Sequence, residues 1–287
     1  MKRSIEVADY SLLFRSASET LTELARDSQH LGAEIGFTAI LHTWSQTLMD
    51  HPHLHCVVTG GGLSLDGQTW TPTRKDFFIP VKVISRLFRG KFLAYLKEAH
   101  QKGKLKFPGQ LAPLETSATF ASYLTDLYQK EWNVYCKPPF GGPEHVMDYL
   151  GRYTHRIAIS NDRIVNLEGD QVTFGYRDST DHDRLKLMSL SAFEFIRRFL
   201  LHILPDGFVK IRHYGIFSNR NRKTKLRRCQ QVLGVPLHND SEDNQETTWE
   251  DLLFRLTGVD PRVCPHCGTG RMVFKEILQP QTNRSPP

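Results

Sequence analysis

The sequence of 287 residues lacks the long hydrophobic runs that membrane-spanning helices need. Such a helix takes about 18 or more apolar residues, and the longest apolar candidates here, residues 199–204 and 56–58, are far shorter. The opening residues MKRSIE are partly basic, but no apolar segment follows them, so no signal peptide is expected. We therefore expect a soluble, cytoplasmic protein without a membrane partner.

Cysteine is also scarce, with five residues in the chain. Two of them form a close pair and the other three are scattered, which in a cytoplasmic protein argues against a disulfide framework. The scattered residues, for which we expect core or neutral positions, are Cys56, Cys136 and Cys229.

The composition is that of a globular protein, because 39% hydrophobic and 24% charged residues exclude wholesale disorder. The net charge of +6 is a modest basic excess, and its distribution is more informative than its size. Residues 219–228 contain six basic and no acidic side chains, whereas residues 240–251 are acidic. The basic run predicts either a solvated helix face or a contact with nucleic acid. Its candidate contacts are Arg220, Arg222, Lys223 and Lys225.

Periodicity predicts an α+β protein with a largely antiparallel sheet, because strands recur in pairs with helices between them. The predicted helices are residues 16–30, 82–102, 118–131, 143–153 and 190–203. The predicted strands are residues 37–44, 53–59, 132–137, 156–160, 164–167, 172–177 and 209–214, with a hairpin turning at Asp66-Gly67.

The segment His51-Pro-His-Leu-His55 is the densest chemical signal. On a strand, residues two apart share a face, so His53 and His55 would project together. Two imidazoles on a rigid strand provide most of a divalent-metal site. His51 lies between Asp50 and Pro52, so we expect it in the approaching loop, behind the ligands or in contact with DNA.

A second signal is Tyr149-Leu-Gly-Arg-Tyr153. Residues four apart share a helix face, so both phenols could face one substrate, although a packed aromatic stripe has the same spacing. Phosphoryl chemistry by tyrosine also needs cations that hold the phosphate. The candidates are Lys137, Arg152 and Arg156.

Five long blocks carry a resemblance that runs, in order, over nearly the whole chain. They are LHTWSQTLMDHPHLHCVVTGGGLSLDG, PVKVISRLFRGKF, KPPFGGPEHVMDYLGRYTHRIAISNDRI, LSAFEFIRRFLLHILPDGFVKIRHYGIFSNRNRK and CPHCGTGRM. The chain closely resembles the HUH-type, two-tyrosine rolling-circle transposases of bacterial insertion sequences and their common-region relatives.

The resemblance implies a metal-dependent nuclease and strand transferase that acts on single-stranded DNA at insertion-sequence ends. His53 and His55 would hold Mg²⁺ or Mn²⁺ at the scissile phosphate. Tyr149 or Tyr153 would form a 5′-phosphotyrosine bond, and the other would serve a second cleavage or the transfer. The implied fold is an HUH-endonuclease-like antiparallel sheet flanked by helices, with the His pair central and the tyrosines on an adjacent helix.

A third metal ligand is not identified by the sequence, and His42, Gln46 and His155 are the candidates. The family's members generally carry a cysteine-rich zinc-binding segment and an apolar strand before the core. Neither is found at the start of this sequence, so we expect an N-terminally shortened copy whose sheet has an exposed edge. The activity of such a copy is open.

The pair Cys264-Pro-His-Cys267-Gly is typical of the knuckle of a zinc ribbon. A complete zinc site needs two more ligands, the sequence has no second Cys-x-x-Cys, and His266 lies inside the turn. We interpret Cys264 and Cys267 as half a zinc site whose partner is missing, so that Zn²⁺ binding requires further ligands.

We therefore expect four parts: a nuclease core at residues 1–217, a basic helix at 218–236, a C-terminal segment with the half knuckle at 237–278, and a disordered tail at 279–287. Two other functions are compatible with the residues. One is a catalytically inactive DNA-binding remnant of such a transposase. The other is a phosphodiesterase or RNA-processing protein that uses the His pair alone. A tyrosine-linked DNA product distinguishes the transposase from both.

Overall fold

The computed structural model describes residues 7–74, 78–154, 158–235, 248, 250–251, 253–254 and 258–273. The chain divides into two compact units, Met1–Val235 and Pro236–Pro287. Among the helices in those ranges, none has the length and hydropathy required to cross a bilayer. The first unit contains all the regular strands and helices described below.

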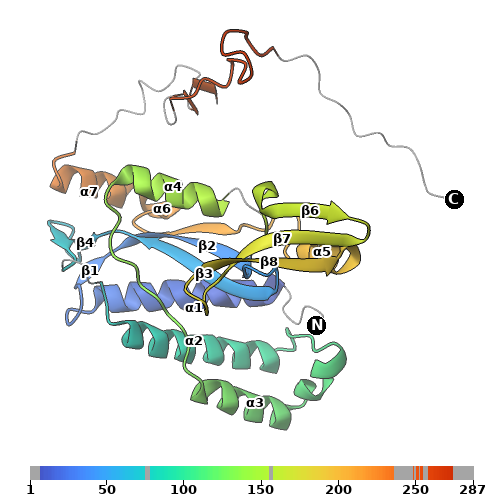
Figure 1. Ribbon diagram of the computed structural model, residues 1–287. Helices are drawn as coiled ribbons and strands as arrows, with labels where there is room; N and C mark the ends of the chain where they lie inside the picture. The colour runs from blue at the N-terminus through green and yellow to red at the C-terminus, as the bar shows by residue number, and fades with distance from the viewer. Residues whose placement is uncertain are drawn as a thin grey trace. The chain divides into compact units, whose positions relative to one another are not determined.

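A three-stranded antiparallel sheet forms the centre of the first unit (Figure 1). Strand β2 (Gly36–Trp44) lies between β3 (Asp50–Val58) and β9 (Ile211–Gly215). Alternate residues of β2 point to opposite faces, so Phe37, Ala39 and Leu41 are buried in the core on one face. His42 and Ile40 lie on the other face of the sheet. We call it the chemical face, because it carries the histidine.

Helices cover the apolar face of this sheet. The aromatic and aliphatic face of α1 (Val7–Arg26) packs on β2, with Tyr10 and Phe14 against Ala39 and Leu41. Helix α2 (Val81–Gln101) packs beyond α1, and α3 (Ser117–Gln129) lies outside α2, as Figure 1 shows. All three helices thus lie on one side of the sheet, and Ile84 of α2 shares a buried cluster with Phe37 of β2.

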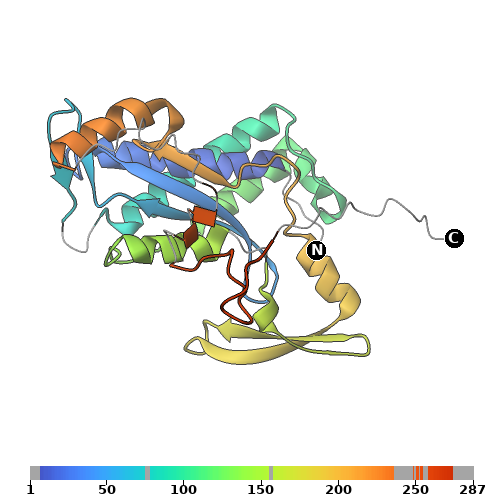
Figure 2. The ribbon, with the colours of Figure 1, turned by 90° about the horizontal axis from the view of Figure 1, so that it is seen from above.

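A second antiparallel sheet comprises β6 (Ile164–Glu168), β7 (Gln171–Asp178) and β8 (Arg184–Ser191). Its inner face packs against α5 (Ala192–Leu200), where Phe174 contacts Phe195 edge to face. Leu48, in the turn between β2 and β3, is completely buried in the same cluster. This packing anchors the tip of the β2–β3 hairpin on the second sheet (Figure 2).

The third sheet is small and supports the basic helical segment. It consists of β1 (Ala33–Glu34), β4 (Gly61–Ser64) and β5 (Trp70–Pro72). Three helical pieces follow β9: α6 (Asn219–Asn221), a π-helical turn η3 (Arg222–Leu226) and α7 (Arg227–Val232). Leu63 of β4 and Cys229 of α7 share one buried cluster.

The remaining elements are α4 and two short 3₁₀ helices. Helix α4 (Pro143–Thr154) begins at a proline, whose fixed φ suits the first helical turn. The 3₁₀ helices are η1 (Gly109–Glu115) and η2 (Asn161–Arg163).

The α+β class and most predicted elements are confirmed, but the single antiparallel sheet is replaced by three sheets. The first helix starts at Val7 instead of residue 16, and β8 was not predicted. The predicted strand at 156–160 is wrong for residues 158–160, which are irregular, while residues 155–157 lie outside the described residues.

The predicted strand at residues 132–137 is also wrong, because that segment is not part of a sheet ladder. Side chains of α2 hold its backbone instead: the Ser85 hydroxyl donates to the Trp132 carbonyl and Arg89 donates to the Lys130 carbonyl. Pro138 and Pro139, which follow, have no N–H groups to donate. The apolar composition of residues 132–137 therefore did not reveal that this stretch contacts side chains of a helix instead of pairing with a strand.

Gly215 tests the register of the central sheet. Its φ is +59°, and a Cβ atom there would lie 1.9 Å from the carbonyl oxygen of Ile35. Gly215→Ala should lower the free energy of unfolding by more than about 2 kcal/mol, because the left-handed backbone and the clash both oppose a side chain. Gly90→Ala, whose Cβ would meet nothing within 4 Å in α2, should be neutral or stabilising. Urea denaturation compares the two variants, and equal stability would contradict this register.

Candidate active site

Three histidines of the central sheet form a cluster on its chemical face. His42 of β2 lies directly opposite His53 of β3, and His55 follows on the same face. One ring nitrogen from each of the three lies within 4.8 Å of the other two. The antiparallel register thus brings together the predicted His pair and one of the three candidates for the third ligand.

The imidazole nitrogens of the pair face each other. His53 Nε2 and His55 Nε2 are 3.0 Å apart, and His53 Nδ1 lies 2.7 Å from the carbonyl oxygen of His51. A carbonyl only accepts, so Nδ1 of His53 donates and its Nε2 carries a lone pair in the neutral ring. Such a lone pair is the form in which imidazole binds metals.

Burial keeps these rings neutral. Burial lowers the pKa of His53, because a charged ring loses its hydration. The pKa of His55 falls to about 4 for the same reason, and the neighbouring His53 and the cation Lys137 contribute to the shift. At neutral pH both rings are therefore uncharged, which is the charge state in which imidazole binds metals. Without a metal, the Nε2–H of His55 donates to the lone pair of His53 Nε2.

The donor set restricts which metal suits the cluster. Three imidazole nitrogens fit a divalent transition-metal ion, whereas Mg²⁺ prefers oxygen ligands. The cluster therefore fits a metal centre, and among the two ions implied by the resemblance its nitrogen donors favour Mn²⁺ over Mg²⁺.

Tyr149 of α4 contacts this cluster. Its hydroxyl lies 2.7 Å from His55 Nδ1, the nitrogen on the far side of the ring from the His53 contact. Phe140, in the loop before α4, has its ring centroid 5.2 Å from that of Tyr149. The Nε2 side of His55 thus faces the other histidines while its Nδ1 side holds a phenol.

Two residues that the sequence analysis did not identify support the cluster. Trp44 stacks on the His42 ring with centroids 4.5 Å apart. His202, after α5, is buried, with Nδ1 3.2 Å from the Thr43 hydroxyl and Nε2 3.0 Å from the Leu48 carbonyl. Both lie at the β2–β3 turn, so they fix the hairpin that carries the ligands.

The approach to the site differs from the sequence-based expectation in two respects. His51 belongs to β3 rather than to a loop, because the pairing of β3 with β2 starts at Asp50. Strand β3 is an outer strand of the described sheet, whereas the resemblance implies a central His pair. The charge of Lys137 contributes to the lowered pKa of His55, and Cys136 contributes to the raised pKa of Cys56. Residues 136 and 137 therefore lie near β3, although the described structure shows no ladder between them.

The other predicted site residues are distributed as follows. Gln46 is exposed in the β2–β3 turn, and its carbonyl accepts from Arg163. Arg152 and Tyr153 lie in α4, but their side chains are outside the described part of the chain. His155 and Arg156 lie outside the described residues altogether.

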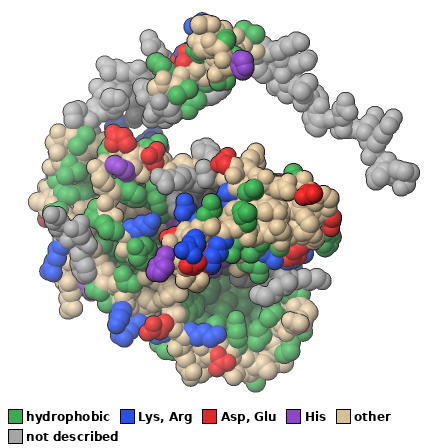
Figure 3. Space-filling view, in the orientation of Figure 1, with side chains coloured by type: hydrophobic (Ala, Val, Ile, Leu, Met, Phe, Trp, Pro, Cys, Tyr) green, Lys and Arg blue, Asp and Glu red, His purple; other side chains and the backbone are tan. Residues whose placement is uncertain are grey.

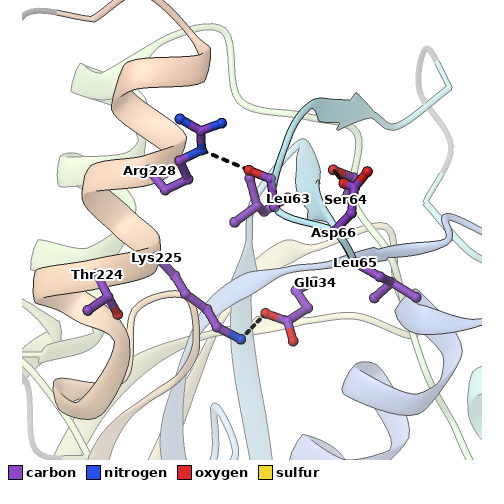
Figure 4. Close-up of a pocket in the computed structure, with 9 residues that line it drawn as sticks. Glu34, Leu63, Ser64, Leu65, Asp66, Thr224, Lys225 and Arg228 are labelled. Atoms are coloured by element: carbon purple, nitrogen blue, oxygen red, sulfur yellow. Dashed lines mark hydrogen bonds and ion pairs between the residues drawn. The ribbon is translucent and has the colours of Figure 1, made fainter.

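The predicted DNA-contact residues of the basic segment fall into two groups. Arg220, Arg222 and Lys223 are exposed, whereas Lys225 forms an ion pair with Glu34 of β1 (Figure 4). Arg228 donates to the Gly67 carbonyl. Glu34, Lys225 and Arg228 all line one surface pocket of about 300 Å³. Lys225 and Arg228 thus attach the segment to the third sheet and leave the first group exposed.

The predicted half zinc site lies in the second unit. Cys264 and Cys267 form a tight turn there, closed by a bridge between Val263 and Arg271. Hydrogen bonds from Thr269 and Gly270 lower the pKa of the Cys267 thiol to about 7.

Comparisons with known proteins match a family model and two relatives over most of the chain. The family model described as "Putative transposase" matches residues 36–225. The chain is 51% identical to "Putative transposase y4qJ" of Sinorhizobium fredii (strain NBRC 101917 / NGR234), over 94% of this chain and 68% of that protein. It is 25% identical to "Transposase for insertion sequence element IS801" of Pseudomonas savastanoi pv. phaseolicola, over 93% and 62%. The chain spans about two thirds of the length of these relatives. No solved structure matches it.

The buried His55 predicts a pH-dependent stability. Its pKa is about 4 in the folded protein and 6.5 in the unfolded chain, so the unfolded chain binds more protons between those values. In metal-free protein the free energy of unfolding should fall as pH decreases from 6.5 towards 4. His55→Gln should make this fall shallower, which urea denaturation in chelator measures across that range. An unchanged slope would contradict the assigned burial.

Proposed function

Because the chain belongs to the transposase family whose model matches residues 36–225, we propose that it cuts and rejoins single-stranded DNA at insertion-sequence ends. The proposed reaction is metal-dependent nicking and strand transfer through a 5′-phosphotyrosine intermediate, as in rolling-circle transposition. We assign the central sheet to the HUH type. The observation that carries the proposal is the hydrogen bond between the Tyr149 hydroxyl and His55, a member of the histidine cluster.

His42, His53 and His55 would hold a divalent cation, which when bound supplies positive charge that polarises the scissile phosphate. The three ligands come from a paired hairpin whose tip is anchored in the core by Leu48. Such a rigid support suits a centre that must hold a phosphate in one orientation.

Tyr149 is the proposed nucleophile. Its oxygen attacks the phosphorus, the bond from phosphorus to the 3′-oxygen breaks, and the leaving strand takes up a proton as its 3′-hydroxyl. When a 3′-hydroxyl attacks the phosphotyrosine, the reverse exchange restores the tyrosine and joins the strands. One phosphodiester bond is broken and one is formed at each stage, so no nucleotide cofactor is needed.

His55 orients this nucleophile. A histidine that offers Nε2 to a cation carries its proton on Nδ1, and here Nδ1 faces the Tyr149 oxygen at 2.7 Å. That N–H donates to the phenol oxygen and favours the loss of its proton. Tyr153, one helical turn later in α4, is the proposed second nucleophile.

Basic side chains supply the proposed DNA contacts. Lys137 is exposed beside His55, and Arg152 and Arg156 belong to the segment around the second tyrosine. Figure 3 shows Lys and Arg side chains gathered near a histidine in the middle of the first unit. Arg220, Arg222 and Lys223 would contact phosphates further along the strand.

Tyr149→Phe tests the proposed nucleophile. It should lower the yield of covalent protein–DNA adduct by at least about a thousandfold, because the attacking oxygen is lost. The cost in stability should be only about 1 kcal/mol, for one hydrogen bond. The measurement is a denaturing gel after incubation with labelled single-stranded element ends and Mn²⁺. Tyr135→Phe, at a side chain that is 80% exposed, is the matched control.

Tyr153→Phe alone should reduce the adduct by about half, because in this proposal Tyr153 forms its adduct only after Tyr149 has cut, and the double variant should form none. A large loss of thermal stability in either variant would assign the phenols to packing instead. Salt-sensitive DNA binding without any adduct in the unmodified chain would favour the inactive DNA-binding remnant.

His53→Ala tests the metal cluster. Metal-stimulated cleavage should fall by at least about 100-fold, because one of three ligands is lost, while binding of single-stranded DNA is retained. Cleavage rates over a Mn²⁺ titration and DNA binding by fluorescence anisotropy measure the two effects. His182→Ala, at an exposed turn, is the control. Unchanged cleavage would remove His53 from the proposed site.

A further inference from the structure

The proposed DNA chemistry assigns no role to the cysteine turn of the second unit. It lies in residues 258–273, within the compact unit Pro236–Pro287, whereas the histidines and Tyr149 lie in Met1–Val235. A function for the turn must therefore come from its own geometry.

The backbone of the turn is folded around the two sulfur atoms. The Cys264 N–H donates to the Gly270 carbonyl at 2.7 Å, and the Gly268 N–H donates to the Cys264 carbonyl at 2.9 Å. The Gly270 N–H donates to the Cys267 sulfur at 3.2 Å. This last bond stabilises negative charge on the sulfur, as hydrogen bonds to the ligands of metal sites do.

Two glycines make this fold sterically feasible. Gly268 has a φ of +69°, a conformation that other residues rarely adopt. A Cβ atom on Gly270 would lie 3.2 Å from the Cys267 sulfur and 3.7 Å from the Cys264 Cβ, so Gly270 packs against both cysteines. The close approach of backbone to sulfur therefore depends on glycine.

The two thiols also point to the same place. The Cys267 sulfur and the Cys264 Cβ both lie next to Gly270, and Cys267 is exposed while Cys264 is half-buried. Two sulfurs that converge at the surface of a rigid turn form one edge of a tetrahedral thiolate site.

We propose that this turn binds Zn²⁺ together with the same turn of a second copy of the chain, so that four thiolates from two chains hold one ion. Structural zinc is four-coordinate, and the described part of the second unit offers two thiols. Of the other cysteines, Cys229 is buried in the third-sheet cluster, Cys56 packs against the central core, and Cys136 is exposed in the first unit. Two identical pairs related by a twofold axis complete a tetrahedron with one kind of contact.

The charge around the turn suits such a site. Four thiolates and one Zn²⁺ carry a net charge of about −2, which nearby cations would offset. Arg271 is exposed and lies opposite Val263 in the bridge that closes the turn. Each copy brings one such arginine, which would offset part of this charge.

The test uses the full chain with zinc or cobalt. We expect one zinc ion bound by sulfur per two chains, and a dimer in analytical ultracentrifugation that chelator converts to monomer. Co²⁺ should give thiolate-to-cobalt charge-transfer absorption, which reports sulfur ligands alone and so excludes the histidine cluster. Cys264→Ser and Cys267→Ser should each abolish the absorption and the metal-dependent dimer.

Cys136→Ser, at an exposed cysteine outside the turn, is the matched control and should retain both signals. Cys264→His should restore metal-dependent dimerisation, because imidazole also binds zinc in tetrahedral sites. The shared site would be wrong if the chain bound a metal ion through sulfur but stayed monomeric in ultracentrifugation. It would also be wrong if added Co²⁺ gave no thiolate-to-cobalt absorption. These readouts do not use DNA cleavage, so they are independent of the proposed transposase reaction.

Discussion

The candidate site depends on the antiparallel pairing of β2 with β3. His42 and His53 meet because they are opposite each other in this register, and His55 joins them because residues two apart share a face. A shift of one residue would turn the histidines of β3 into the core and bring Leu54 and Cys56 to the surface. The burial of Leu48 and the two hydrogen bonds of His202 hold the hairpin turn, so they also hold the register.

The same pairing determines the electrostatics of the cluster. Rings packed face to edge between a sheet and α4 lose water, and this loss lowers the pKa of both His53 and His55. The folded chain therefore holds two neutral imidazoles close together, beside His42. A cation bound among the three rings would replace part of the lost hydration.

Much of this arrangement could be predicted from the sequence. The His-x-His spacing on a strand and the helix that starts at Pro143 are local patterns, and both are present. The sequence could not single out His42 among the three candidates for the third ligand. That choice depends on the hairpin register, which is determined by the turn around Leu48 and not by any pattern near His42. The support by His202 could not be predicted, because it joins residues 159 positions apart in sequence. The segment 132–137 was misassigned because its partners are the side chains of α2.

The bond between Tyr149 and His55 has a mechanical consequence. Helix α4 follows a long irregular segment, and that phenol is one of its links to the sheet. If Tyr149 becomes joined to phosphate as proposed, its oxygen becomes that of a phosphate ester, which is a weaker acceptor for the Nδ1–H of His55. The covalent step would then loosen the helix from the sheet just as the helix gains a DNA end. Formation of the proposed adduct would thus weaken the contact between Tyr149 and His55. Helix α4 could then move with the attached strand, while the histidines stay fixed on the hairpin.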